Sequence, residues 1–289
     1  MRFSFGDSMC DPSHYLPLAR AVEDLGYDSF PVPDSICYPD VAVGEYPYKA
    51  DGGREFLDGA PFIDPFQLIA ALGTVTERLR FKTSVLKLPI RNPVLVAKMT
   101  SSLAYLTGNR FVLGVGLSPW IEDFQVTNQD WKTRGRRMDQ MIEIVRGLMS
   151  GEYYEFHSEF YDIPRIKLCP VPGEPVPIMI GGHSPAAYRR AARLADGFMF
   201  AGVNKAELAA TVAEIDAYRR EYGREDEPFE IHAGVVELQG AADLAWLEDV
   251  GVTELGLGPR NAYEPDSLNV QQKIEIASRL ADELGVGAR

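Results

Sequence analysis

The segment Pro177-Ile-Met-Ile-Gly-Gly-His-Ser-Pro185 joins a short apolar run to two glycines, a histidine, a serine and a proline. The apolar run predicts a buried strand, and the glycines permit a sharp turn after it. A serine before a proline is typical of a helix start, because serine caps a free N–H group and proline suits the first helical position. Asp64-Pro65 and Asn92-Pro93 repeat this device. The segment therefore predicts one unit of a repeated strand, turn and helix.

Eight apolar or β-branched runs alternate with eight stretches of helical period along the chain. The predicted strands cover residues 2–6, 28–32, 80–86, 110–116, 177–180, 197–201, 229–238 and 253–257. The predicted helices cover residues 13–25, 65–77, 93–106, 134–149, 185–195, 205–222, 241–249 and 268–284. Eight such units favour an α/β fold, the (β/α)8 or TIM barrel, as a single domain over residues 1–289. A doubly wound sheet is the structural alternative.

Two insertions interrupt the alternation, one after the second strand and one before the fifth. Residues 35–60 follow the second strand and contain Tyr38, Tyr46 and Tyr48. This connection leaves the carboxyl end of its strand, where barrels carry their active sites, and its length predicts a functional loop. Residues 151–176 predict a hairpin and a proline-rich connector, which either embellishes the side of the barrel or forms a wall of the site.

Composition and charge narrow the class of protein. The 289 residues are 46% hydrophobic and 25% charged, which is ordinary globular composition. A formal charge of −13 disfavours a nucleic-acid partner, because a polyanion is repelled. No apolar run approaches the ~20 residues of a membrane span. With no secretory signal and three widely spaced cysteines, Cys10, Cys37 and Cys169, we expect a cytoplasmic protein without a disulfide framework.

Glycines end the predicted strand 110–116. Gly114 and Gly116 suggest a dinucleotide-binding turn, but Pro119 stands where that turn needs a third glycine or alanine. A Rossmann domain is therefore not expected. Two interpretations stay open: the small residues admit a flat or anionic ligand close to the backbone, or they simply pack within the barrel.

The turn after the strand 177–180 aims free N–H groups and the positive end of a helix dipole above the barrel, which suits a phosphate. The alternative is a plain strand-to-helix turn. Ser184 also lies in a near match to a nucleophile elbow. That chemistry fails because Pro185 has no N–H group for an oxyanion hole.

Histidines and cations show no metal-binding spacing. His14, His157, His183 and His232 lie on separate elements, so no metal site is predicted. His183 and His232 are candidates for polar groups of a pocket, His232 more as a core residue. The cations that open the helix 134–149 are expected to pair with nearby acids on a solvated face; they are Lys132, Arg134, Arg136 and Arg137, with Glu122, Asp123 or Asp130 as partners.

Four motifs occur in order: Phe81-Lys-Thr-Ser-Val-Leu-Lys-Leu-Pro-Ile-Arg-Asn-Pro93, Gly108-Asn-Arg-Phe-Val-Leu-Gly-Val-Gly116, Pro177-Ile-Met-Ile-Gly-Gly-His-Ser184 and Ala191-Ala-Arg-Leu-Ala-Asp-Gly-Phe198. Together they resemble the luciferase-like monooxygenase family, most closely its deazaflavin-dependent oxidoreductases, which use coenzyme F-420. The resemblance covers about residues 1 to 260. It implies a (β/α)8 barrel, usually homodimeric, that binds a flavin or deazaflavin at the carboxyl ends of its strands.

The resemblance also implies site residues. Asp34 would contact the deazaflavin ring, and Ser84 and Val85 match a bulge with a non-prolyl cis peptide behind that ring. Other cofactor contacts follow from the motifs: Leu117 and Ser118 along the ribityl and phosphate path, and Gly181, Gly182 and His183 at the phosphate through backbone N–H groups. The candidate substrate contacts, which lie where a barrel presents its substrate face, are Tyr38, Arg91, Trp120 and Arg260.

Two positions depart from the sugar-phosphate dehydrogenase branch of that family. Where that branch has an acid–base histidine and glutamate, this chain has Ser35 and Pro119. The acid–base pair therefore cannot be carried over. Asp34 and Ser35 are the catalytic candidates, and Glu122 and Asp123 are open alternatives.

Three hypotheses about function follow. The first is a hydride transfer between F-420 and a small organic substrate. The second is an FMN-dependent monooxygenase that uses reduced FMN, oxygen and a partner flavin reductase. The third is a cofactor-binding protein without turnover. A groove for the acidic tail of F-420 would need local cations, for which the candidates are Lys49, Arg54, Lys87 and Arg91.

Overall fold

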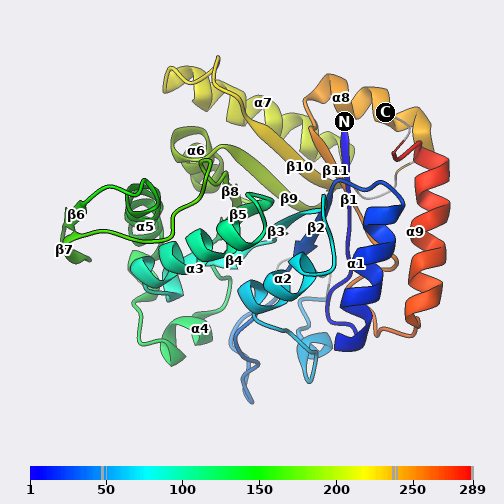
Figure 1. The fold of residues 1–289 in the computed structure, drawn as a ribbon, viewed down its shortest axis with the longest axis horizontal. Coiled ribbons are helices and arrows are strands. Elements are labelled where there is room, and N and C mark those ends of the chain that lie inside the picture. Colours follow the sequence, from blue (N-terminus) through cyan, green and yellow to red (C-terminus); the bar gives the residue numbers. More distant parts are fainter. Residues whose placement is uncertain (47–48, 50, 236–237, 239, 288–289) are drawn as a thin grey trace.

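A closed barrel of eight parallel strands forms the centre of the molecule (Figure 1). The computed structural model describes residues 1–46, 49, 51–235, 238 and 240–287. Strand β1 (Arg2–Phe5) pairs with β2 (Ser29–Val32) on one side and with β11 (Glu254–Leu257) on the other, which closes the sheet. The predicted (β/α)8 barrel is therefore confirmed, and the doubly wound sheet is excluded.

The remaining barrel strands follow the predicted order. They are β3 (Arg80–Thr83) with its continuation β4 (Leu86–Lys87), β5 (Phe111–Gly116), β8 (Ile178–Gly181), β9 (Gly197–Val203) and β10 (Glu230–Val235). The prediction of one continuous strand over 80–86 was wrong, because a cis peptide bond between Ser84 and Val85 divides β3 from β4. The predicted extension of the seventh strand to 238 includes residues 236 and 237, which lie outside the described part.

Helices surround the barrel. They are α1 (Tyr15–Asp24), α2 (Pro65–Gly73), α3 (Pro93–Leu106), α4 (Ile121–Val126), α5 (Arg134–Met149), α6 (Pro185–Leu194), α7 (Lys205–Glu221), α8 (Leu244–Val250) and α9 (Val270–Leu284). At the right of Figure 1, the first and last helices lie side by side. None of the helices in the described ranges is long and apolar enough to cross a membrane.

Local capping explains where three of these helices begin. The Asp64 carboxylate accepts the Phe66 N–H at 3.0 Å, and the Asn92 side chain accepts the Val94 N–H at 2.9 Å. The Ser184 hydroxyl accepts the Ala187 N–H at 3.3 Å. Each cap is followed by proline at the first helical position, as predicted.

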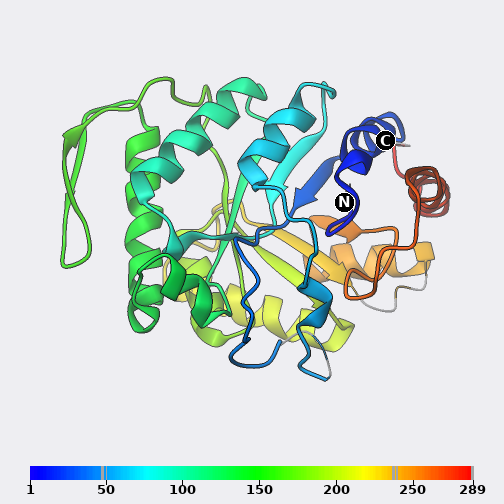
Figure 2. The same cartoon turned by 90° about the horizontal axis from the view of Figure 1, so that it is seen from below.

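Two connections leave the regular pattern. Residues 33–64 join β2 to α2 and contain a 3-10 turn at Glu55–Leu57. A hairpin of β6 (Tyr154–His157) and β7 (Asp162–Ile166) lies between α5 and β8 and stands away from the barrel at the left of Figure 2. Cavities open at the carboxyl ends of the barrel strands, and none of the hairpin residues lines them. This arrangement favours an embellishment of the side over a wall of the site.

The strands place large aromatic side chains outside the barrel, whereas the interior holds polar side chains and a small apolar cluster. Phe30, Phe81 and Phe111 are fully buried in the core under the helices. The neighbouring interior positions carry Lys82 and His232, which are buried as well. A small apolar cluster of Val112, Met179, Met199 and Val85 lies in the same barrel interior.

Lys82 anchors this interior polar layer. Its ammonium group donates to Glu254 Oε1 and lies 3.2 Å from His232 Nδ1. His232 Nε2 in turn lies 2.7 Å from Glu230 Oε2, and the Ser29 hydroxyl donates to Glu254 at 2.7 Å. Burial and the adjacent Lys82 lower the pKa of His232, so this histidine is neutral and links the two charged groups. The prediction that His232 belongs to the core is confirmed.

Glu230 makes stability depend on pH. Burial alone would raise the pKa of Glu230, but hydrogen bonds from His232 and Arg2 lower it from 4.5 to about 2. The stabilising contribution of the folded carboxylate is therefore complete above pH 4.5 and lost as the pH falls toward 2. We expect the stability difference between wild type and Glu230→Gln, from urea unfolding at pH 7, 5 and 3, to shrink at the lowest pH. The exposed Glu152→Gln serves as control, and a pH-independent difference would contradict the assignment.

Candidate active site

Three adjoining cavities open at the carboxyl ends of the barrel strands. The main cavity has a volume of about 280 Å³, and it shares walls with a second of about 250 Å³ and a third of about 210 Å³. Residues at or near strand ends form one side of the main cavity: Asp34, Ser35, Ser84, Val85, Lys87, Leu117, Gly181, Gly182, His183 and Met199. Aromatic residues form the other side: Tyr46, Phe56, Phe62, Trp120 and Tyr263.

The cis peptide bond between Ser84 and Val85 lies in the wall of the main cavity. The prediction of a non-prolyl cis peptide at this position is confirmed. An ideal Cβ on Gly116 would lie 2.6 Å from Val85 Cγ2, and one on Gly181 would lie 2.9 Å from Val85 Cγ1. Gly114 faces the Thr83 carbonyl oxygen in the same manner. Of the two interpretations of the strand glycines, the structure favours packing within the barrel.

Asp34 is held by its neighbours at the end of β2. Its carboxylate accepts the Lys87 backbone N–H and an Arg91 N–H, both at 2.8 Å. The Arg91 guanidinium also donates to the Lys87 carbonyl oxygen at 2.8 Å. Both Asp34 oxygens are thereby engaged, and this set of bonds ties the end of β2 to the segment after the cis peptide. Ser35 lies beside it on the cavity wall.

The second cavity lies against the turn from β8 to α6. Its walls include Gly181, Gly182, His183 and Ser184 together with Leu117 and Ser118. The N-terminus of α6 supplies backbone N–H groups and a positive dipole end at this point. An ideal Cβ on Gly182 would lie 2.7 Å from Ala187 Cβ, so glycine here also lets α6 approach the turn. Burial lowers the pKa of His183, which opposes protonation of its ring.

Two arginines border the second cavity. Arg190 is paired with Asp139, whereas Arg134 stacks on the Trp131 ring at 3.7 Å and donates to the Trp131 carbonyl oxygen at 2.8 Å. Within the described ranges, no carboxylate lies within 4.0 Å of the Arg134 guanidinium. The expectation that Arg134 pairs with acids on a solvated face was therefore wrong. An arginine of this kind beside a helix N-terminus suits an anionic group.

The aromatic side of the main cavity is a stacked cluster. The Tyr46 and Trp120 rings lie 5.3 Å apart at an interplanar angle of 22°, and Tyr46 meets the edges of Phe56 at 5.1 Å and Tyr263 at 5.5 Å. The Arg54 guanidinium covers the Trp120 ring at 3.7 Å. The connection 33–64 thereby closes the outer side of the cavity.

A buried ion pair fastens this connection to α4. Arg54 donates to Glu122 Oε1 at 3.0 Å, and the Val43 N–H donates to the same oxygen at 2.6 Å. Both charged side chains are less than one tenth exposed. Burial would raise the pKa of Glu122, but the Val43 N–H, its own N–H and Arg54 together lower it. We call the Arg54, Glu122 and Val43 contacts the latch.

A second buried pair lies behind the wall. Lys87 Nζ is 2.7 Å from Asp123 Oδ2, and the Ser118 hydroxyl also donates to this carboxylate. Glu122 and Asp123 are thus paired with Arg54 and Lys87, and neither lines the main cavity. The alternative that one of them supplies the missing acid–base group is not supported.

Four groups near the third cavity form a charged cluster. Arg260 lies 3.3 Å from Asp7 Oδ1 and 3.4 Å from Asp266 Oδ1, while Lys273 Nζ lies 2.6 Å from Asp7 Oδ2 and 2.5 Å from Asp266 Oδ2. Arg260 therefore borders the third cavity rather than the main one, and its charge is already balanced.

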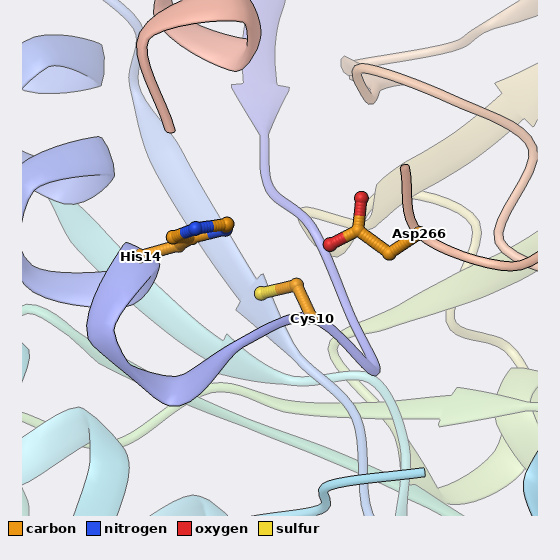
Figure 3. Close-up of side chains that lie close together, drawn as sticks. All are labelled: Cys10, His14 and Asp266. Carbon is orange, nitrogen blue, oxygen red and sulfur yellow. The ribbon is translucent and has the colours of Figure 1, made fainter. Parts of the chain in front are cut away.

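Cys10, His14 and Asp266 lie close together in this cluster, as Figure 3 shows, with their potential ligand atoms within 4.8 Å of one another. Such a trio could hold a metal ion. However, Lys273 Nζ is 3.1 Å from His14 Nδ1 and bonded to Asp266, so a metal ion would have to displace an ammonium group. Burial, with Asp7 nearby, raises the pKa of Cys10 to about 11, which makes its thiol a poor ligand. Lys273 therefore already occupies the place that a metal ion would take between His14 and Asp266.

The structure brings most of the predicted site residues together. Asp34, Ser35, Ser84, Val85, Leu117, Trp120, Gly181, Gly182 and His183 line the main cavity, and Ser118 lines the second. Among the predicted substrate contacts, Tyr38 and Arg91 line none of the three cavities, and Arg260 lines the third. The predicted groove of free cations is wrong, because each member is ion-paired: Lys49 with Asp51, Arg54 with Glu122, Lys87 with Asp123 and Arg91 with Asp34. Tyr48 lies outside the described residues.

Sequence reasoning missed the positions of Phe56, Tyr263 and Arg134 on the cavity walls. Phe56 and Tyr263 belong to connections of different ends of the chain and meet only in the folded molecule, with ring centroids 5.4 Å apart. Phe56 had a signal in the aromatic content of the long connection, whereas Tyr263 lies between β11 and α9 and had none. Arg134 had a signal in its position, since a cation at the start of a helix opposes the helix dipole and so needs a reason to be there.

The closed (β/α)8 barrel with its cavities at the strand carboxyl ends defines an enzyme of the barrel class. The chain belongs to the luciferase-like monooxygenase family, whose model matches residues 6–243. The family identified from the four motifs is thereby confirmed. The chain is an oxidoreductase of this family.

The chain is similar to proteins of other organisms over almost its whole length. An uncharacterized protein of Mycobacterium tuberculosis is 51% identical over 288 residues, covering 98% of this chain and 99% of the relative. An F-420-dependent glucose-6-phosphate dehydrogenase of Gordonia bronchialis is 28% identical over 286 residues, covering 96% of this chain and 78% of the relative.

Two solved structures share the fold over nearly the whole chain. An F-420-dependent secondary alcohol dehydrogenase in complex with an F-420–acetone adduct has a TM-score of 0.77 at 17% identity, covering 98% and 99% of the two chains. The monooxygenase RslO1 from Streptomyces bottropensis has a TM-score of 0.76 at 14% identity, covering 100% of both. Likenesses at these identities show the common barrel.

Proposed function

We propose that this protein is an F-420-dependent oxidoreductase that moves a hydride between the deazaflavin and a small organic substrate. The observation that carries the proposal is the pairing of two cavities with different chemistry. One lies between strand ends and a wall of aromatic side chains and suits a flat ring, and the adjoining one offers an arginine and a helix N-terminus to an anion. The named activity of the Gordonia bronchialis relative supports the choice of F-420.

The residues present fit such a cofactor. Ser84 and Val85 would support the ring from behind, and Asp34, fixed by Arg91, would hold the neighbouring backbone rigid against it. The turn at Gly181, Gly182 and His183 would donate backbone N–H groups to the phosphate. Leu117 lines both cavities, and Ser118 beside it lines the second. When bound, F-420 would supply or accept the hydride, while the protein orients the reactants and excludes water.

We assign proton transfer during the reaction to the residues at and beside Asp34. Because both Asp34 oxygens accept hydrogen bonds, Asp34 acts by positioning, and Ser35 is the neighbouring hydroxyl on the cavity wall. A Ser35→Ala variant that keeps F-420 binding but loses turnover would support a role for this hydroxyl in proton transfer.

The proposal includes a homodimer of single-domain chains, as the family resemblance implies, and the cytoplasm as its compartment, which the three widely spaced cysteines favour. Helix α3 supports a dimer, because it exposes the apolar side chains of Leu95, Tyr105 and Leu106. Surfaces of this kind are common at protein interfaces. Sedimentation of the purified protein would distinguish a dimer from a monomer.

Parallel calorimetric titrations with F-420 and FMN, each oxidised and reduced under anaerobic conditions, test the cofactor. Micromolar binding of F-420 with weak binding of FMN is the expected result. Preference for reduced FMN, with oxygen consumption, would move the protein to the monooxygenase alternative and imply a partner reductase. Tight binding without turnover over a wide substrate panel would favour the third hypothesis.

Replacing Arg134 with methionine is expected to weaken F-420 binding about tenfold or more, because a charge-assisted hydrogen bond to phosphate contributes roughly 1.5–3 kcal/mol. The matched control is Arg136→Met. This variant removes an exposed arginine of the same helix, and that arginine is paired with Glu159. Equal affinities of the two variants would refute the assignment of the second cavity to the phosphate.

A further inference from the structure

The charges that border the main and third cavities cancel one another. Lys87 lines the main cavity and Arg260 lines the third. Each lies within 4.0 Å of a carboxylate, and so do the cations close behind these walls, Arg54, Arg91 and Lys273. Their partners are also five in number: Glu122, Asp123, Asp34, Asp7 and Asp266. In the part of the chain that the structure describes, these cavities therefore present no cation left over for a phosphorylated ligand.

The second cavity differs in this respect. Arg134 lies on its wall without a carboxylate partner among the described residues, next to the N-terminus of α6. Among the described residues, the second cavity is therefore the position in the barrel mouth that suits an anionic group, and the proposed cofactor phosphate takes it. An additional anion on the substrate would have to enter the main cavity, where every bordering cation is neutralised.

The outer wall of the main cavity has the opposite preference. Tyr46, Phe56 and Tyr263 form three edge contacts with centroids 5.1–5.5 Å apart, and Tyr46 is nearly parallel to Trp120. Leu57 and Phe62 extend this wall. Stacked and edge-on aromatic rings attract flat apolar groups beyond the effect of the buried area alone. The latch holds Trp120 in place from behind through Arg54.

We propose that the substrate of the main cavity is an uncharged, planar and largely apolar molecule, and that Tyr46 and Trp120 determine this specificity. The inference rests on the proposed function, because the substrate is assigned to the space between the cofactor side and the aromatic side. Such a substrate would distinguish this chain from an enzyme that acts on phosphorylated sugars, although the Gordonia bronchialis relative is named as one.

Calorimetric titration with three probes tests the substrate class without relying on turnover. Menadione is planar and uncharged, glucose is uncharged but polar, and glucose 6-phosphate adds negative charge. Menadione is titrated into protein loaded with oxidised F-420, and the sugars into protein loaded with reduced F-420, so that no hydride transfer accompanies binding. We expect menadione to bind at least about tenfold more tightly than either sugar.

Variants of the aromatic wall test the two named residues. Tyr46→Leu and Trp120→Leu are each expected to raise the dissociation constant of menadione about fivefold, the size of a lost aromatic contact. The matched control is Tyr153→Leu on the hairpin, an exposed tyrosine that stacks with Arg165 outside the cavities. Tyr46 lies in a surface connection, so its variant stays informative even if Trp120→Leu fails to fold.

The possible outcomes separate the inference from the function on which it rests. Absence of F-420 binding, with menadione still bound by the free protein, would overturn the proposed function alone. Tighter binding of glucose 6-phosphate than of menadione by the F-420-loaded protein would overturn the substrate class alone. Equal effects of the Tyr46, Trp120 and Tyr153 variants would remove the two residues from that role.

Discussion

Replacing Glu254 with glutamine should lower the free energy of unfolding by about 3–5 kcal/mol, because it leaves the buried Lys82 ammonium group without its counter-charge. Lys82 and Glu254 are only 4% and 1% exposed. Their neighbours His232 and Ser29 are neutral, and Arg2 Nε lies 3.6 Å from the second Glu254 oxygen. Burial would raise the pKa of Glu254, but Lys82, His232 and the Ser29 hydrogen bond together lower that pKa, so the carboxylate stays charged in the folded barrel. Urea unfolding at pH 7 measures the change.

A double-variant cycle separates charge from packing. Lys82→Met combined with Glu254→Gln removes both charges and should recover most of the lost stability, because burying a neutral pair has no comparable cost. The exposed Arg136–Glu159 pair is the control, and Glu159→Gln should change the stability by less than about 1 kcal/mol. Additive losses in the Lys82 and Glu254 cycle would show that the pair is not coupled.

Replacing Arg54 with methionine should release the connection 33–64 from α4. The change leaves Glu122 buried without its cation and removes the guanidinium from the Trp120 ring. Breaking a buried pair costs about 3–5 kcal/mol, so local opening of the connection should become at least about a hundredfold more frequent. Hydrogen exchange of the Val43 amide, which donates to Glu122, measures the opening directly.

The effect of the Arg54 variant should stay local. The barrel core does not include Arg54, so amides of β1 and β11 should keep their exchange rates. Arg136→Met again provides the control, since it removes an exposed arginine of a surface pair. An unchanged exchange rate at Val43 in Arg54→Met would show that the latch does not hold the connection.

Features set by neighbouring residues could be predicted from the sequence. Helices α2, α3 and α6 begin where Asp64, Asn92 and Ser184 precede a proline, because each cap bonds to an N–H group two or three residues away. Helix α4 escaped prediction because it has six residues and no side-chain cap at Trp120. The break between β3 and β4 came from the family resemblance, not from the strand pattern.

The site could be predicted only in part. Residues that directly follow strands, such as Asp34 and Gly182, were located because a barrel brings all strand ends to one face. Pairings between distant residues had no local signal: Arg54 meets Glu122 across 68 positions, and Lys82 meets Glu254 across 172. Arg91 and Arg260 lie on the expected face, yet Asp34 and Asp7 neutralise them, which position alone does not reveal.

The stacking of arginines on two tryptophans should make the intrinsic fluorescence of the protein sensitive to bound ligands. Of its three tryptophans, Trp120 lies under Arg54 at the main cavity and Trp131 under Arg134 at the second, while Trp246 lies near Lys205 on the outside of the barrel. A ligand that enters one cavity should alter the intrinsic emission of the indole on that wall and leave the other unchanged. Variants with a single tryptophan would therefore record, in real time, the order in which the two cavities fill.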